Sequence, residues 1–191
     1  VGSTCIQTLQ RAVLAKGADV GVALDGDGDR LIMVDSEGGV LDGDDILYII
    51  ARSRQQNGGL RGSVVGTQMS NLGLEQALHG RGIGFERTAV GDRYIMELLK
   101  QQGWVLGGEP SGHIICLDRT TTGDGIISAL QVLAEVVKSG SSLQALRKDV
   151  EKYPQLLQNI HLGEVAAKQV MGAKALNDAV SAVRSELGNN D

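Results

Sequence analysis

Aromatic residues are scarce in this sequence of 191 residues, which has one tryptophan, one phenylalanine and three tyrosines. It also has no long basic run, and its formal net charge is −5. Nucleic-acid surfaces need clustered lysine and arginine side chains, and single strands are commonly held by stacking on aromatic rings. The sequence therefore predicts no nucleic-acid partner.

Long apolar runs and cysteine pairs are lacking as well. Apolar runs such as 46–51 are far shorter than the roughly 20 residues that cross a bilayer. No basic segment followed by an apolar one marks a secretory signal. Cys5 and Cys116 lie far apart in the sequence, and a chain of this size needs no disulfide staple. We expect a cytoplasmic protein with no membrane partner.

The hydrophobic fraction of 42% is enough for a core of one or two domains. Apolar spacing predicts helices over 4–16, 46–55, 72–78, 93–101, 126–137 and 165–187. It predicts strands over 20–24, 31–34, 40–41, 63–66, 84–88, 104–106, 113–117 and 155–162. This alternation predicts an α/β fold in which mixed, mostly parallel sheets are flanked by helices.

The sharpest motif is the acidic run DGDGDR, in which Asp25, Asp27 and Asp29 alternate with glycines after an apolar strand. Glycines allow the backbone to curl tightly, so the three carboxylates can converge on one hard cation such as Mg²⁺. Without a cation, carboxylates this close would repel one another. The run therefore predicts a metal site.

The acidic run allows three other interpretations. A calcium EF-hand needs glycine and glutamate at its sixth and twelfth positions, where this chain has Arg30 and Ser36. A phosphatase of the haloacid dehalogenase class also begins with a DGD-like pattern, but usually has threonine where Asp29 stands. A solvated acidic turn is the plainest alternative.

A second motif, GGEPSGH, spans 107–113 between two predicted strands. The carboxylate of Glu109 and the hydroxyl of Ser111 could together bind a vicinal diol, although such Gly-Pro-Ser-Gly segments are often simple turns. His113 could act as an acid or base near neutral pH, or be a structural side chain.

Two further segments precede predicted helices. Thr122 or Asp124 is expected to cap the helix that starts at Ile126, where free amides could also face an anion. Arg93 could meet a phosphate, while Asp92 before it could cap the next helix. For the helix over 46–55, the expected caps are Asp44 or Asp45.

The motifs DGDGDR, VGDRY, GEPSGH and TTTGDG, in this order, resemble the α-D-phosphohexomutase superfamily. The phrases DRTTTGDGI and GTQMSNLGLE are most similar to the bacterial phosphoglucosamine mutases within it. The resemblance covers essentially the whole chain. It implies the end of domain II over 1–39, domain III over 40–152 and the start of domain IV over 153–191.

That family uses a phosphoserine to convert glucosamine 6-phosphate through a 1,6-bisphosphate to glucosamine 1-phosphate. The product serves UDP-N-acetylglucosamine and cell-wall precursor synthesis, and Mg²⁺ supports each transfer. No segment here resembles the family's TASHNP serine loop or its SGTEP phosphate clamp. The resemblance thus implies an inactive internal fragment, whose partners are the sugar phosphate and the remaining domains of the same polypeptide.

The resemblance also assigns roles to matching positions. Asp25, Asp27 and Asp29 match the metal ligands, and Arg30 matches the arginine beside the transferring phosphate. Further along the chain, Glu109 and Ser111 match sugar-hydroxyl contacts, and His113 matches a residue proposed to assist proton transfer. Arg93 is expected in the substrate cleft, with no catalytic role assigned to it.

Two alternatives stay open. The motifs alone do not tell an amino sugar from a hexose, so a phosphoglucomutase or phosphomannomutase fragment fits them too. A stand-alone module that binds metal and sugar phosphate is the alternative from a different class of protein.

Overall fold

The computed structural model of the chain describes residues 5–163 and 167–187. By its internal contacts the chain divides into two compact units, Val1–Pro154 and Gln155–Asp191. The predicted site residues all lie in the first unit, so its architecture decides how they meet.

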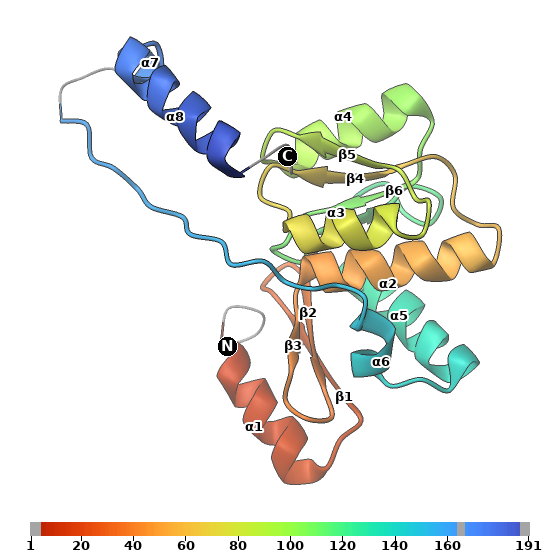
Figure 1. The fold of residues 1–191 in the computed structure, drawn as a ribbon. Helices are drawn as coiled ribbons and strands as arrows, with labels where there is room; N and C mark the ends of the chain where they lie inside the picture. The colour runs from red at the N-terminus through yellow and green to blue at the C-terminus, as the bar shows by residue number, and fades with distance from the viewer. Residues whose placement is uncertain (1–4, 164–166, 188–191) are drawn as a thin grey trace. The chain divides into compact units, whose positions relative to one another are not determined.

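The first unit alternates helices and strands along the chain (Figure 1). Its helices are α1 (Ile6–Lys16), α2 (Gly43–Gln56), α3 (Leu72–His79), α4 (Asp92–Gln102), α5 (Gly125–Ser139) and α6 (Leu143–Arg147). Its strands are β1 (Val20–Leu24), β2 (Leu31–Asp35), β3 (Val40–Leu41), β4 (Val64–Thr67), β5 (Phe85–Thr88), β6 (Leu106–Gly108) and β7 (Ile114–Cys116). The sequence did not predict α6, and it placed β6 two residues too early.

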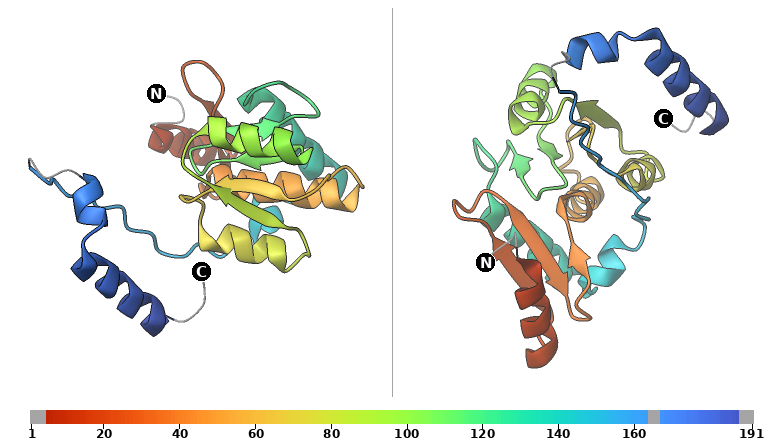
Figure 2. Two further views of the ribbon diagram at one scale, coloured as in Figure 1. Left: turned by 90° about the horizontal axis from the view of Figure 1, so that it is seen from above. Right: turned by 90° about the vertical axis from the view of Figure 1, so that its left-hand side faces the viewer.

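The strands form two sheets of different kinds. The first, β1-β2-β3, is antiparallel throughout, with Val20 opposite Asp35. The second has the order β5-β4-β6-β7, in which β4 runs parallel to both β5 and β6 and only β7 is antiparallel. Helix α4 covers one face of this sheet, and α2 and α3 lie on the other (Figures 1 and 2). The predicted α/β class with mostly parallel, helix-flanked strands is confirmed.

Helix α2 is the centre of the core. Its residues from Gly43 to Ala51 are all buried, because it packs against β2, β3 and β6 as well as α3, α5 and α6. The unbroken apolar segment from Ile46 to Ala51 covers all sides of the helix, and such a segment is expected to be enclosed in this way. Since α2 contacts strands of both sheets, it fixes the loops of one sheet relative to those of the other.

Helix starts follow the predicted capping chemistry only in part. Asp124 caps α5, because its carboxylate accepts from the backbone N–H of Ile127 at 2.8 Å. At α2 the expected caps, Asp44 and Asp45, are wrong: Asp42 is the N-cap, and Asp45 instead completes a capping box with the Asp42 backbone.

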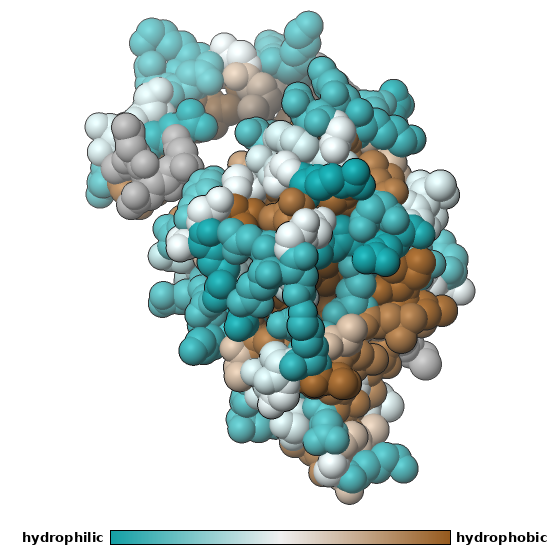
Figure 3. All heavy atoms as spheres, turned by 90° about the vertical axis from the view of Figure 1, so that its right-hand side faces the viewer, coloured by the Kyte–Doolittle hydropathy of each residue, from teal (hydrophilic) through white to brown (hydrophobic). Residues whose placement is uncertain are grey.

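Helix α5 has an unusual distribution of apolar side chains. Ile126, Leu130 and Val137 are exposed, whereas the positions buried against the core are Ser128, Ala129, Val132 and Glu135, besides Gly125. The space-filling view of the right-hand side of Figure 1 shows a region of apolar surface (Figure 3). The strong apolar periodicity of 126–137 therefore predicted the helix correctly but not which of its sides is buried.

The second unit differs from its prediction. The strand expected over 155–162 is wrong, because that segment has no secondary structure and its side chains are almost all exposed. The helix expected over 165–187 is two helices, α7 (Ala167–Met171) and α8 (Lys174–Leu187); positions 165 and 166 lie outside the described residues. Over 5–163 and 167–187, none of the helices has the length and apolar character needed to cross a bilayer.

Candidate active site

The acidic loop, residues 25–30, connects two strands of the antiparallel sheet, β1 and β2. Its turn is closed by Asp25, whose Oδ1 accepts from the backbone N–H of Gly28 at 3.1 Å and of Arg30 at 3.2 Å. Gly28 has φ +77°, a conformation that favours glycine. The glycine-rich spacing of the sequence thus curls the loop so that its carboxylates face one another.

The carboxylates of Asp25, Asp27 and Asp29 converge, with ligand oxygens all within 4.8 Å of one another. Oδ1 of Asp29 is buried and has no hydrogen-bond partner among the described residues. Three hard oxygen donors and one unsatisfied buried oxygen suit a divalent cation such as Mg²⁺. The donor set fits the predicted metal.

Close packing of these carboxylates changes their proton affinities in opposite directions. Burial and the neighbouring carboxylate of Asp25 raise the pKa of Asp29. Burial also acts to raise the pKa of Asp25, but the backbone N–H of Arg30 and the Asp29 carboxyl outweigh it and lower that pKa. A cation in the loop would relieve this repulsion.

Residues 109–112, called the sugar loop after the role that the sequence resemblance implies, join β6 to β7 and are tied to the acidic loop. It closes on itself because Gly112 donates to the Glu109 carbonyl at 3.0 Å. The carbonyl of Gly112 then accepts from the Leu31 backbone N–H at 3.0 Å, directly after the acidic loop. Gly112 has φ +94°, and a Cβ there would collide with the Leu31 carbonyl. Only glycine allows the two loops to approach this closely.

The first residues of two helices hold both loops through backbone hydrogen bonds. The backbone N–H of Gly125, at the start of α5, donates to the Gly28 carbonyl at 2.9 Å. Gly43, at the start of α2, donates to the Pro110 carbonyl at 3.0 Å. The motif TTTGDG thus helps to hold the acidic loop, besides capping α5.

His113 links the two loops through its side chain. Its side chain is only 6% exposed, and Nδ1 lies 3.0 Å from Oδ2 of Asp29. Its Nε2 is buried, has no hydrogen-bond partner in the described part of the chain, and lies 3.8 Å from Oδ2 of Asp92. An ionised carboxylate only accepts hydrogen bonds, so the contact with Asp29 places a proton on Nδ1.

The remaining predicted residues differ in position. Arg30 is half exposed, with Nε 3.8 Å from Oδ2 of Asp25, which leaves its guanidinium open to an anion. Glu109 Oε1 accepts from the Gly91 backbone N–H at 3.1 Å, while Ser111 is exposed. These residues meet around the two loops, so the structure brings together motifs that are far apart in sequence.

Arg93 is the predicted residue with the weakest link to this group. Its side chain is 79% exposed and pairs with Glu97 at 2.8 Å on the same helix. A substrate-binding role for it stays a prediction.

Sequence reasoning missed Asp92 as a site residue. The sequence allows it to cap α4, but the N-cap is Gly91. Among the described residues the Asp92 carboxylate accepts a hydrogen bond from the adjacent Arg93 N–H, and it faces His113. Its place in the motif VGDRY was the one available signal.

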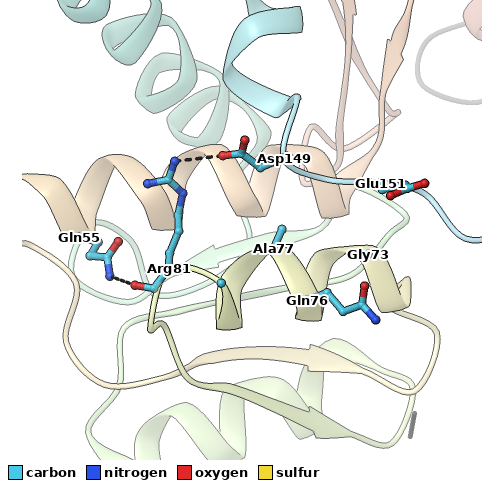
Figure 4. A pocket seen from close by; sticks show the side chains of 8 residues that line it. Gln55, Gly73, Gln76, Ala77, Arg81, Asp149 and Glu151 are labelled. Atoms are coloured by element: carbon cyan, nitrogen blue, oxygen red, sulfur yellow. Dashed lines mark hydrogen bonds and ion pairs between the residues drawn. The ribbon is translucent and has the colours of Figure 1, made fainter. Parts of the chain in front are cut away.

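A separate cavity of about 570 Å³ lies between α2, α3 and the segment after α6 (Figure 4). Its cationic group, Arg81, is neutralised by Asp149 at 3.0 Å, and Gln55 donates to the Arg81 carbonyl at 2.8 Å. None of the predicted site residues lines it. The candidate active site is therefore the group around the two loops.

Comparison with known proteins identifies the family that these motifs indicate. Residues 42–153 match the family described as phosphoglucomutase/phosphomannomutase, alpha/beta/alpha domain III. The phosphoglucosamine mutase of Thioalkalivibrio sulfidiphilus is 60% identical over 188 residues, and that of Methylococcus capsulatus is 55% identical over 190 residues. These matches cover 98% and 100% of this chain and 42% of each relative. The chain thus spans about two-fifths of the curated relatives that it matches.

Solved structures agree in fold. A phosphoglucomutase/phosphomannomutase family protein from Burkholderia thailandensis has a TM-score of 0.66 at 24% identity, over 79% of this chain and 33% of its own. An Aspergillus fumigatus N-acetylphosphoglucosamine mutase, solved with GlcNAc-6P and magnesium, has a TM-score of 0.62 at 20% identity, over 80% of this chain and 37% of its own. The family resemblance predicted from sequence is confirmed, and the chain belongs to the phosphoglucomutase/phosphomannomutase family.

Proposed function

We propose that this chain is the part of a phosphoglucosamine mutase that holds the metal and the sugar during conversion of glucosamine 6-phosphate to glucosamine 1-phosphate. The observation that carries the proposal is the convergence of Asp25, Asp27 and Asp29 beside buried His113. The names of the relatives at 55–60% identity support the choice of an amino sugar.

In this proposal Asp25, Asp27 and Asp29 hold Mg²⁺, which when bound neutralises negative charge on the phosphoryl group that is transferred. The half-exposed guanidinium of Arg30 binds phosphoryl oxygens from the same side. The acidic loop and Arg30 thus act together on the phosphoryl group.

His113 and the sugar loop act on the hydroxyl side. The contact between Nδ1 and Asp29 fixes the ring, so Nε2 is the atom that can accept a proton from a substrate hydroxyl and return it. Glu109 and Ser111 bind sugar hydroxyls, with Glu109 oriented by the Gly91 N–H. Because the bisphosphate intermediate presents similar hydroxyls after it reorients, the same two residues serve both half-reactions.

The proposed domain boundaries are 1–39, 40–152 and 153–191. The family match over 42–153 and the unit boundary after Pro154 support them. We also propose a cytoplasmic setting, which the free thiols of Cys5 and Cys116 support.

The test uses the full-length protein that contains this chain. We expect it to convert glucosamine 6-phosphate with a higher kcat/KM than glucose 6-phosphate or mannose 6-phosphate, in a magnesium-dependent manner. We expect no turnover by the 191-residue chain alone. A preference for a hexose phosphate would instead assign the chain to a phosphoglucomutase or phosphomannomutase, and binding without turnover by the full-length protein would favour a binding module.

A further inference from the structure

The β4–α3 loop, residues 68–71, belongs to the segment GTQMSNLGLE, which has no role in the proposed chemistry. Strand β4 lies between β5 and β6 in the sheet. From β4 the chain continues through α3 to β5 on one side, whereas from β6 it continues through the sugar loop to β7 on the other. Ligands of α/β sheets commonly bind where such connections diverge at the carboxyl ends of parallel strands. The β4–α3 loop and the sugar loop lie on the two sides of that point.

The start of α2 holds these two loops together. The Gly43 N–H donates to the Pro110 carbonyl of the sugar loop at 3.0 Å. The next residue, Asp44, accepts through Oδ2 from the Asn71 N–H of the β4–α3 loop at 2.8 Å. Since consecutive residues of one helix bind both loops, the loops are neighbours in the fold.

The strand register places Gln68 near Glu109. In the parallel pairing of β4 with β6, Val65 lies opposite Gly107, and Gln68 and Glu109 follow shortly after this pair on adjacent strands. Adjacent strands are about 4.7–4.9 Å apart. On the other side of β4, the Gln68 N–H donates to the Thr88 carbonyl at 3.0 Å. Gln68 therefore stands at the same end of the sheet as the carboxylate that is proposed to bind sugar hydroxyls.

Hydrogen bonds fix the backbone of the β4–α3 loop. Oγ of Ser70 accepts from the Thr67 N–H at 3.1 Å, and Oγ1 of Thr67 accepts from the Met69 N–H at 3.2 Å. The guanidinium of Arg87 donates to the carbonyl groups of Thr67 and Ser70 at 3.1 and 2.8 Å. A backbone held in this way is preorganised, so a side chain on it can bind a ligand at a low entropy cost.

Gln68 has the one polar side chain of this loop that the fold does not use. The side chains of Ser70 and Asn71 bind backbone groups, whereas that of Gln68 is exposed and has no hydrogen-bond partner among the described residues. Its amide offers two N–H donors and a carbonyl acceptor. A sugar hydroxyl also donates and accepts, so the two groups can match each other.

We propose that the side-chain amide of Gln68 binds a ring hydroxyl of the sugar phosphate, beside the hydroxyls held by Glu109 and Ser111. The inference rests on the proposed function. The sugar ring carries more polar groups than Glu109 and Ser111 hold, so a further partner is needed. Because the amide is neutral, the contact serves an amino sugar and a hexose alike and orients the ring rather than selecting its charge.

Gln68→Leu in the full-length protein tests this, with dissociation constants for glucosamine 6-phosphate, glucose 6-phosphate and inorganic phosphate measured by titration calorimetry. Leucine can neither donate nor accept a hydrogen bond. We expect both sugar phosphates to bind about three- to tenfold more weakly, because a neutral hydrogen bond is lost. Binding of inorganic phosphate should be unchanged, as should the thermal unfolding midpoint, because the Gln68 side chain is exposed.

Two further variants serve as controls. Gln102→Leu is matched to Gln68→Leu, because Gln102 is also exposed but lies at the end of α4, away from the carboxyl ends of the parallel strands. It should leave all three constants unchanged. Gln68→Asn keeps the amide on a shorter side chain, and its constants should lie between those of the wild type and of Gln68→Leu.

Unchanged sugar-phosphate binding in Gln68→Leu, or an equal loss in Gln102→Leu, would overturn the inference and leave the proposed function intact. An equal loss for the sugar phosphates and inorganic phosphate would place Gln68 at the phosphoryl group and overturn its assignment to a hydroxyl. A full-length wild-type protein that fails to bind glucosamine 6-phosphate would overturn the proposed function and the inference with it.

Discussion

Two turns in this chain carry three aspartates each, the acidic loop over 25–30 and a second turn, DGDD, over 42–45. In the acidic loop the carboxylate oxygens converge and one of them, on Asp29, is buried without a partner among the described residues. In the second turn the carboxylates are held by the fold. Equal acidity in sequence therefore leads to different chemistry.

The fold holds the second turn through a helix start and a lysine, although Oδ1 of Asp44 and Oδ1 of Asp45 are also buried without a hydrogen-bond partner among the described residues. Asp42 Oδ1 accepts from the backbone N–H groups of Asp44 and Asp45 at 3.0 and 3.2 Å. Lys152 Nζ lies 2.6 Å from Asp42, 3.6 Å from Asp45 and 3.9 Å from Asp44. Asp44 also accepts from the Asn71 N–H at 2.8 Å. The cation that balances these charges is part of the chain.

This difference indicates which kind of acidic run is able to bind a metal. Glycines between the carboxylates let all three turn inward, whereas adjacent aspartates at a helix start point to different neighbours. Burial raises the pKa of Asp44 and of Asp45 to about 6. The second turn is thus a structural clasp, defined here as residues 42–45 with Lys152.

The largest expected effect comes from Asp27→Ala in the full-length protein. Removing one oxygen ligand should lower mutase turnover by about a hundredfold or more, because metal-assisted charge stabilisation is worth several kcal/mol. Asp27 is exposed, so the thermal unfolding midpoint should be unchanged. Steady-state turnover at saturating magnesium checks this, and full activity in the folded variant would remove the metal role of the loop.

Breaking the clasp should instead affect stability. Lys152→Met leaves Asp42, Asp44 and Asp45 without their cation and should reduce the free energy of unfolding by about 1–3 kcal/mol. Lys174 provides the matched control, because its pair with Asp178 is exposed and such pairs contribute about 0–1 kcal/mol. Urea unfolding compares the two variants, and an equal loss in both would contradict a special role for Lys152.

A smaller, pH-dependent effect is expected from Asp44→Asn. The folded-state pKa of about 6 lies above the unfolded value near 4, so the folded protein binds the proton more tightly. The contribution of Asp44 to stability is therefore full below about pH 4 and declines as pH rises to about 6. Asparagine does not titrate, so the stability of the wild type relative to the variant should fall by about 1–3 kcal/mol across that window.

Urea unfolding at pH 4, 5, 6 and 7 measures this change. A difference between wild type and variant that stays constant, or that grows as pH rises, would contradict the raised pKa of Asp44.

Much of the fold could be predicted from sequence because local patterns determine it. The spacing of apolar residues predicts the strands of the first unit and its helices apart from α6, and the glycine spacing predicts the curled acidic loop. The strand expected over 155–162 is absent because a strand forms only where a partner strand pairs with it, and no described strand pairs with this segment.

The site could be predicted only in its parts. Nothing local in the sequence indicates that His113 contacts Asp29, 84 positions earlier, or that Lys152 reaches Asp42, 110 positions earlier. Such contacts depend on how α2 and the two sheets pack. For the same reason the sequence indicates only a possible helix cap at Asp92, and not its position beside His113.

Magnesium titration calorimetry on the full-length protein tests most directly the claim that the acidic loop binds metal and the clasp does not. We predict that Asp27→Asn weakens magnesium binding by at least about tenfold, since one of three carboxylate ligands loses its charge. Asp45→Asn should bind magnesium as the wild type does. Loss of binding in Asp45→Asn with unchanged binding in Asp27→Asn would contradict the account.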